Sequence, residues 1–495
     1  MSARPLMRTP AGWAASLAGS VILAGCAGGA SMPAADAARM NRIVGNLRPP
    51  VVVEGTTPAT YRLDDRLARH RVPGVSIAVV DSGRIVWAHG FGLKEAGTAD
   101  SVTAATLFQA ASISKPVTAT AMLRLVEQGT LSLDEPVNRY LKSWQVPENR
   151  FTALAPVTLR RIVSHSAGLT VHGFPGYAVT DSIPSVGQVL DGLKPANTAP
   201  VRVDTVPGAI WRYSGGGTTV MQLLLTDVTG EAFPALMQRL VLGPVGMTSS
   251  GYDQPLPEAR RGVESAAHDR TGAVIAGRWH VYPEMAAAGL WTTPTDLLRW
   301  AMAIAAARAG RDSSLLSPRM ATAMLTLQHG TSGLGPMLTG AGRSFRFGHG
   351  GANEGFRCDL VYFPETGQGA AVMSNGDNGG ALVQEVMLAI AAEYGWPDYG
   401  PKKLTLISRP ASEFAPFLGR FSITEPQAVT IEVSADGDKL FVEAAGVMPR
   451  SEVGFVAADR VASLESGDEL TFVLDRRGAA SAIRFAGYTF ERDRR

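Results

Sequence analysis

A serine and a lysine stand three residues apart in the stretch Ser112-Ile113-Ser114-Lys115. Residues with this spacing share one face of a helix, so the Ser112 hydroxyl and the Lys115 amine can point the same way. A serine hydroxyl is a weak nucleophile until a neighbouring base takes its proton, and a lysine of lowered pKa can be that base. The spacing therefore predicts a nucleophile and its base at the start of a helix, where the helix dipole favours developing negative charge.

Other arrangements that carry hydrolytic or nucleotide chemistry are absent from the sequence. No serine lies in a G-x-S-x-G pattern, and the 8 histidines form no H-E-x-x-H motif. The chain also has no Walker or dinucleotide-binding glycine pattern, so we expect neither a metal nor a cofactor. Lys115 is the only lysine of the chain that follows a serine at a distance of three residues.

The segment around this pair resembles a known family. Residues 108–116 (F-Q-A-A-S-I-S-K-P) resemble the nucleophile segment of the serine β-lactamase and penicillin-binding-protein superfamily. The closest resemblance is to the class C β-lactamase-like branch, which includes DD-peptidases and family VIII carboxylesterases. Segments similar to further motifs of that family follow in its order and extend the resemblance over about residues 58–395: 133–137, 163–169, 207–208 with 211–216, 288–297 and 348–351.

The resemblance implies a role for each matching side chain. Ser112 would be the acylated nucleophile, and Lys115 would be its base or the cation that keeps Tyr213 ionised. Tyr213 would relay a proton between Ser112 and the leaving group, which a phenol of pKa near 10 can do only beside a cation. Which of the two groups takes the serine proton stays open at this point.

The strand motif at His349 would complete the site implied by the resemblance. The backbone N–H groups of Ser112 and Ala352 would form an oxyanion hole. Gly350 and Gly351 would let an edge strand approach the substrate closely. His349 itself is either a substrate contact or a structural hydrogen-bond donor.

Two departures from the family pattern bear on the substrate. The family's Y-x-N is Y-S-G at residues 213–215, which removes a side-chain amide that contacts the substrate amide in β-lactamases of this branch. The family's K-T-G is H-G-G at residues 349–351, which replaces a fixed cation by a group of pKa near 6.5. Both changes weaken recognition of a free carboxylate, so we expect hydrolysis of esters or amides rather than efficient β-lactamase action.

Two alternatives remain beside this reading. The same machinery would serve a D-Ala-D-Ala carboxypeptidase or a weak β-lactamase, and the substrate would then be a peptidoglycan peptide or a β-lactam. The other alternative is a non-catalytic envelope binding lipoprotein. His165 and Ser166, in the family-like segment 163–169, are expected to serve loop structure rather than chemistry.

The N-terminal stretch predicts export and lipid anchoring. A basic start with Arg4 and Arg8 leads into the apolar stretch 13–23, which is too short to span a bilayer comfortably. It ends in Leu-Ala-Gly-Cys26, which resembles the lipobox of bacterial lipoproteins; the alternative is a secretory signal with a chance cysteine. Alanine follows Cys26, which by resemblance to lipoprotein sorting favours the outer membrane. We therefore expect a cell-envelope protein, lipidated at Cys26 and held on the periplasmic side of a bacterial membrane.

The elements that must position the site follow an α+β pattern. Strand-like runs at 75–80 and 85–88 precede the Ser112 segment, and others at 345–347, 358–363 and 370–373 close the region. The sequence between them is mostly helical in pattern, from 112 to 308. This order predicts one antiparallel sheet flanked by helices, with an all-helical subdomain, as in the β-lactamase/transpeptidase-like fold.

Alternating strand-like runs continue beyond a break at residues 396–401 and predict a small C-terminal antiparallel β domain, either a sheet or a barrel. The predicted organisation is a signal peptide at 1–25, a lipidated tether at 26–57, a hydrolase domain at 58–400 and the β domain at 405–495. With 46 basic and 44 acidic residues, the chain has a net charge of +2, which argues against a nucleic-acid partner.

Overall fold

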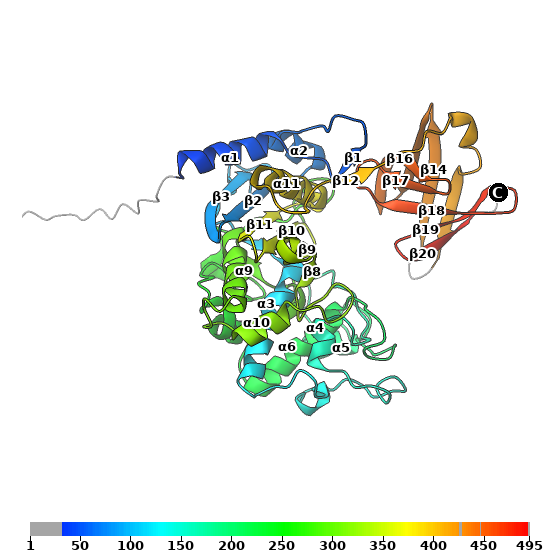
Figure 1. The fold of residues 1–495 in the computed structure, drawn as a ribbon. Helices are drawn as coiled ribbons and strands as arrows, with labels where there is room; N and C mark the ends of the chain where they lie inside the picture. The colour runs from blue at the N-terminus through cyan, green and yellow to red at the C-terminus, as the bar shows by residue number, and fades with distance from the viewer. Residues whose placement is uncertain (1–31, 425–427, 446, 494–495) are drawn as a thin grey trace, which may run out of the picture.

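The computed structural model describes residues 32–424, 428–445 and 447–493 (Figure 1). The predicted signal peptide and the predicted lipidation residue Cys26 lie outside these residues. Among the described residues, no helix combines the length and apolar character needed to cross a bilayer.

A six-stranded sheet forms the centre of the larger part of the molecule, and each pair of neighbouring strands is antiparallel. Its spatial order is β3 (Arg84–Gly92), β2 (Gly74–Asp81), β11 (Gln368–Ser374), β10 (Phe356–Phe363), β9 (Arg346–Asn353) and β8 (Met337–Thr339). The first two strands precede the Ser112 segment in the chain and the other four follow it. The prediction that the two ends of this region build one sheet is therefore confirmed.

Both faces of the sheet are buried, and residues 77–80 of strand β2 show why this part of its sequence is continuously apolar. Ile77 and Val79 belong to the hydrophobic cluster on one face, whereas Ala78 and Val80 belong to the cluster on the other. Alternate residues of a strand point to opposite faces, so a strand covered on both sides needs apolar residues at every position.

Three helices cover one face and lie together in Figure 1: α1 (Ala34–Gly45), α2 (Leu63–His70) and α11 (Gly379–Tyr394). A buried ion pair between Arg66 and Glu385 joins α2 to α11. The spacing of Tyr61, Leu63 and Leu67 predicts a helix over residues 58–71. The structure shortens it at the start, because Tyr61 pairs with Leu47 in a β-bridge and α2 begins only at Leu63.

The other face carries the region with most of the remaining helices: α3 (Ser114–Glu127), α4 (Leu159–Val163), α5 (Val186–Asp191), α6 (Gly215–Thr229), α7 (Phe233–Met237), α8 (Met285–Ala288), α9 (Pro294–Arg308) and α10 (Pro318–Met324). The stretch Thr-Pro-Thr-Asp at residues 293–296 predicts the start of a helix. The structure confirms it, because Thr293 accepts a hydrogen bond from Asp296 N and Pro294 occupies the first turn of α9. Two short antiparallel pairs join loops here: β4 (Phe108–Gln109) with β7 (Trp291–Thr292), and β5 (Tyr177–Ala178) with β6 (His280–Val281).

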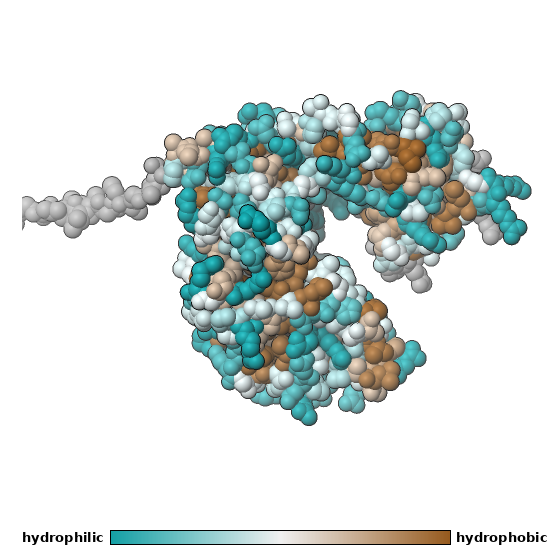
Figure 2. Space-filling model, viewed as in Figure 1, coloured by the Kyte–Doolittle hydropathy of each residue, from teal (hydrophilic) through white to brown (hydrophobic). Residues whose placement is uncertain are grey.

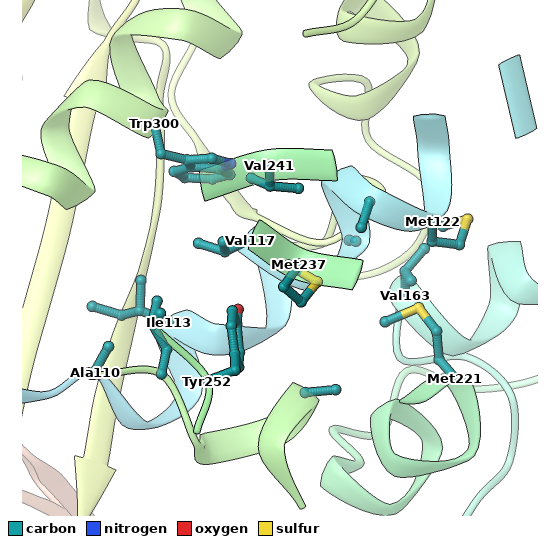
Figure 3. Packing of buried hydrophobic residues seen from close by; sticks show 14 of the residues in the cluster. Ala110, Ile113, Val117, Met122, Val163, Met221, Met237, Val241, Tyr252 and Trp300 are labelled. Atoms are coloured by element: carbon teal, nitrogen blue, oxygen red, sulfur yellow. The ribbon is translucent and has the colours of Figure 1, made fainter. Parts of the chain in front are cut away.

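Helix α3 lies in the middle of this region, and Figure 3 shows the apolar side chains packed around it. Ile113 and Val117 stand beside the Tyr252 ring, and Trp300 of α9 lies nearby. The Tyr252 hydroxyl donates to the Ser114 carbonyl oxygen at 3.0 Å, and both groups are buried. The helix that carries Lys115 and directly follows Ser112 is therefore fixed on several sides by packing.

The C-terminal part is a closed eight-stranded barrel of β13 (Gly419–Ile423), β14 (Val429–Asp436), β15 (Lys439–Ala444), β16 (Met448–Ala457), β17 (Arg460–Ser463), β18 (Glu469–Leu474), β19 (Ala480–Phe485) and β20 (Tyr488–Arg492). Its interior is filled by side chains such as Phe421, Phe455 and Phe472. A parallel pair, β1 (Val51–Val53) with β12 (Lys402–Leu404), packs on Ala462 of the barrel and connects it to the larger part. Figure 2 shows an open hollow between the barrel and the region that contains α4, α5 and α6.

The predicted fold class, an α+β unit with an antiparallel sheet followed by a small antiparallel β domain, is confirmed. Six of the eight barrel strands were predicted from strand-like runs at 417–421, 429–433, 439–443, 469–474, 482–485 and 488–490, whereas β16 and β17 were missed. Pro449 and Gly454 interrupt the alternating pattern of β16, and β17 is only 4 residues long.

Candidate active site

Ser112 lies in a 3-10 turn, Ala111–Ile113, immediately before α3. The prediction placed it on the helix itself, but the helix begins two residues later, at Ser114. Ala111 has a φ of 49°, a left-handed conformation that residues other than glycine seldom adopt. Ala110 and Ile113 are fully buried on either side, which holds the turn while the Ser112 side chain remains partly exposed.

Lys115 is in the first turn of α3 and is buried, with 5% of its surface exposed. Its Nζ atom donates to Ser112 Oγ at 3.0 Å and to the carbonyl oxygen of Ala287 at 2.8 Å. Ala287 belongs to α8, so a helix from 172 residues later in the chain fixes the direction of the lysine. The structure thus places Ser112 and Lys115 in contact, as their spacing in the sequence predicted.

Tyr213 reaches the same place from the segment before α6. Its ring centre lies 5.0 Å from Lys115 Nζ, an arrangement of a cation over an aromatic face. The Tyr213 hydroxyl is buried and has no hydrogen-bond partner among the described residues. In this geometry, the hydrogen bond to Ser112 comes from Lys115 and not from Tyr213.

Three histidine rings surround Tyr213. The centres of the His165, His172 and His349 rings lie 4.2, 4.9 and 5.9 Å from the centre of the phenol ring. Burial, reinforced by the charge of Lys115, lowers the pKa of all three histidines, that of His165 well below its usual value and that of His349 to about 4. A neutral imidazole has one donor and one acceptor nitrogen, so these side chains offer hydrogen bonds rather than positive charge at neutral pH.

His165 and Ser166 hold the loop after α4. The Nδ1 atom of His165 accepts a hydrogen bond from Ser214 N at 3.2 Å, and the Ser166 hydroxyl lies 3.0 Å from that of Ser164. These contacts fit the loop role expected of both residues. In addition, the tilted stacking of the His165 ring on Tyr213 fixes the phenol in place.

Strand β9 carries His349, Gly350, Gly351 and Ala352 past the nucleophile turn. Strand β8 pairs only with residues 346–348, so the rest of this edge of β9 has no strand partner among the described residues. A side chain at Gly351 would clash with the Ala110 carbonyl oxygen and the Cys358 sulfur. Only glycine therefore permits the strand to lie so close to Ser112.

His349 is 7% exposed, and its Nε2 atom is buried without a partner among the described residues, whereas Nδ1 lies 2.6 Å from the Gly350 carbonyl oxygen. One ring nitrogen of His349 therefore makes a local structural contact. The other has no partner among the described residues and can contact a substrate.

A buried network behind the site was not predicted. Asn353 donates from Nδ2 to Gln109 Oε1 at 2.7 Å and to the Ala288 carbonyl oxygen at 3.1 Å. Gln109 lies just before the nucleophile turn. Ala288 is the residue after Ala287, whose carbonyl oxygen accepts a hydrogen bond from Lys115. The network links β9, α8 and the nucleophile segment. Asn353 directly follows the predicted oxyanion residue, but nothing in the sequence shows where its amide points.

Glu284 was also missed. It is the residue before α8, is completely buried, and neither carboxylate oxygen has a hydrogen-bond partner among the described residues. Burial raises the pKa of this carboxyl to about 7. Within the described part of the chain, no cluster of three or more His, Cys, Asp or Glu side chains could hold a metal ion.

The sequence is similar to those of known proteins. A family model described as Beta-lactamase matches residues 61–393. Esterase EstB of Burkholderia gladioli is 30% identical over 203 residues, which are 39% of this chain and 51% of that protein. The D-aminopeptidase of Gluconobacter oxydans is 26% identical over 363 residues, 71% of this chain and 64% of the other. The chain thus spans about half to two thirds of the length of these curated relatives.

A solved structure shares the fold. The octameric penicillin-binding protein homologue from Pyrococcus abyssi aligns with a TM-score of 0.57 and 22% identity, and the alignment covers 86% of this chain and 98% of that one. The predicted β-lactamase/transpeptidase-like architecture is therefore confirmed.

Proposed function

The chain belongs to the beta-lactamase family, and on that premise we propose that it is a serine hydrolase that cleaves ester or amide bonds through an acyl-enzyme on Ser112. The observation that carries the proposal is the 3.0 Å hydrogen bond between Lys115 Nζ and Ser112 Oγ. It joins a partly exposed hydroxyl to a buried amine, which is the pairing that nucleophilic catalysis by serine requires.

In the first half of the reaction, Lys115 takes the proton of the Ser112 hydroxyl as Oγ attacks the carbonyl carbon. The N–H groups of Ser112 and Ala352 stabilise the negative charge on the former carbonyl oxygen. Tyr213, whose buried hydroxyl has no other partner among the described residues, passes a proton to the leaving group as the bond to it breaks. Water then attacks the acyl-enzyme by the same steps in reverse.

The proposed substrate is an uncharged ester or amide. Lys115 already donates to two oxygens, and the three histidines around Tyr213 have lowered pKa values, so the described site offers little positive charge to a substrate carboxylate. The similarity to an esterase supports ester cleavage.

A second candidate is a peptidase that acts on D-amino-acid peptides. The similarity to a D-aminopeptidase, which spans 71% of this chain, favours it over β-lactam hydrolysis. The proposed catalytic groups serve both candidates, because attack on an ester or an amide carbonyl gives the same kind of tetrahedral intermediate.

A substrate panel separates the candidates. Short-chain p-nitrophenyl esters, a chromogenic cephalosporin and a D-Ala-D-Ala peptide are incubated with the protein and with Ser112→Ala as the control. We expect the esters to be cleaved fastest, and only by the protein with Ser112. Faster cleavage of the peptide or the cephalosporin would favour the second candidate or a β-lactamase, and no turnover of any substrate would favour a non-catalytic binding protein.

We also propose that the protein works in the bacterial cell envelope, lipidated at Cys26 and facing the periplasm, with the outer membrane favoured. The support is the basic and apolar stretch that ends in Leu-Ala-Gly-Cys26. A substrate of the envelope, such as a cell-wall peptide or an ester that crosses the outer membrane, would be within reach of the site.

A further inference from the structure

The loop between α4 and β5 brings one more side chain to the site, His172. The loop is fixed to the start of α6 by backbone hydrogen bonds, because the Val171 and His172 carbonyl oxygens each accept at 3.0 Å, from Gly216 N and Gly215 N. Ser214 Oγ adds a bond to the Thr170 carbonyl oxygen at 2.7 Å. These contacts determine where His172 lies.

The backbone before His172 is strained. Val171 has a φ of 62°, in the left-handed region, which is rare for any residue with a branched Cβ. Such a conformation is strained and persists only where the surroundings impose it. Here it directs the chain so that the His172 ring stacks 4.9 Å from the Tyr213 ring.

The loop fills the place where a side chain at position 215 would lie. A Cβ atom on Gly215 would be 3.1 Å from both the His172 carbonyl oxygen and the Phe174 ring, and 3.5 Å from Gly173 Cα. A side chain at position 215 would therefore require this loop to shift by a few tenths of an ångström. Glycine at this position lets the loop lie close to the start of α6.

The His172 imidazole is available to a ligand. The residue is exposed, and its ring has no hydrogen bond to any residue in the described part of the chain. By contrast, His165 and His349 at the same phenol each have a ring nitrogen in contact with the backbone. An exposed imidazole can give one hydrogen bond and accept another.

We propose that His172 is a specificity-determining residue that hydrogen-bonds an uncharged polar group, an amide or a hydroxyl, close to the scissile carbonyl of the substrate. The inference rests on the proposed hydrolytic function of Ser112. The polar group can belong to the acyl part or to the leaving group, and substrates that carry it on one side only distinguish the two.

The test compares substrate pairs that differ in this group. For the acyl side, the pair is the p-nitrophenyl ester of N-acetylglycine and p-nitrophenyl butyrate. For the leaving group, the pair is 2-hydroxyethyl butyrate and propyl butyrate. The measured quantity is the ratio of kcat/KM within each pair, taken for each variant relative to the unaltered protein, which cancels the intrinsic reactivity of the substrates.

Three variants are compared. His172→Phe keeps an aromatic ring on Tyr213 without hydrogen bonds, and His172→Asn keeps a hydrogen-bonding group. The matched control is His89→Phe, an exposed histidine on β3 at the far edge of the sheet that also stacks on an aromatic ring.

We expect His172→Phe to lower the ratio about tenfold in one of the two pairs, the loss of one hydrogen bond, while His172→Asn restores most of it and His89→Phe leaves it unchanged. An unchanged ratio in His172→Phe for both pairs would overturn the proposal, as would a loss that His172→Asn does not restore. Failure of the proposed function gives a different result, because the unaltered protein would then hydrolyse none of the four esters.

Discussion

Lys115 Nζ lies 3.0 Å from Ser112 Oγ, between the 3-10 turn that carries the serine and the first turn of α3. A second bond, to the Ala287 carbonyl oxygen, holds the amine in that direction. Tyr213 presents its ring face to the same nitrogen at 5.0 Å, and its hydroxyl is not bonded to Ser112. The sequence left open which of the two residues is the base, and this geometry favours Lys115.

Replacement of the base should stop acylation. We expect Lys115→Ala to lower kcat/KM on a p-nitrophenyl ester on the order of 10³-fold or more, because the serine hydroxyl would lose its proton acceptor. The control is Lys403→Ala, which removes an exposed lysine of β12. A near-native rate in Lys115→Ala would show that another group takes the proton.

The activity should not depend on protonation of His349 between pH 5.5 and 8. Burial and the charge of Lys115 lower the pKa of this residue to about 4, so it is neutral over the whole range. We expect His349→Gln to change the rate but not the shape of the plot of log kcat/KM against pH. An inflection in this range that disappears in the variant would contradict the neutral His349.

Glu284 should make the protein less stable as the pH rises. Burial raises its pKa from 4.5 to about 7, so the unfolded chain loses this proton at lower pH than the folded one. Below pH of about 4.5 the carboxyl is neutral in both states, and between about 4.5 and 7 ionisation increasingly favours the unfolded state.

We therefore expect Glu284→Gln to gain free energy of unfolding relative to the unaltered protein as the pH rises, by about 3 kcal/mol between pH 4.5 and 8. Urea denaturation at both pH values measures this change. Glu148→Gln, at an exposed position, is the control. The same difference between Glu284→Gln and the unaltered protein at both pH values would contradict the raised pKa.

Lipidation at Cys26 predicts a change of location. In Cys26→Ser, the protein should leave the membrane fraction and appear in the soluble fraction, because a polypeptide without its lipid has no other predicted anchor. Partition between detergent and aqueous phases measures this. Equal partition of the variant and the unaltered protein would refute the lipidated cysteine and favour the alternative, a secretory signal with a chance cysteine.

Local patterns predicted much of the fold. The hairpin of β2 and β3 follows from two β-branched runs around Asp81-Ser82-Gly83, and the start of α9 follows from Thr293 and Pro294. The extent of the helical region was overestimated, because long stretches between α3 and α9 are loops. These loops are joined by short pairings of distant segments, such as Tyr177–Ala178 with His280–Val281. Sequence periodicity contains no information on such partners.

The residues of the candidate site could likewise be predicted only in part. Ser112 and Lys115 could be paired from their spacing, and Tyr213 and the glycines of β9 from the order of the motifs. His172, Asn353 and Glu284 could not, because their importance depends on where loops from distant parts of the chain bring them. A histidine in a loop has no sequence signal that separates a surface residue from one stacked on a buried phenol.

The most direct test of the central claim is to find the residue that becomes covalently modified. The protein is treated with a fluorophosphonate, digested and examined by mass spectrometry, with Ser112→Ala treated in parallel. We predict one adduct, on the peptide that contains Ser112, and we predict that Ser112→Ala has neither the adduct nor ester hydrolysis. Hydrolysis that persists in Ser112→Ala, or an adduct on another residue, would contradict the proposed acyl-enzyme.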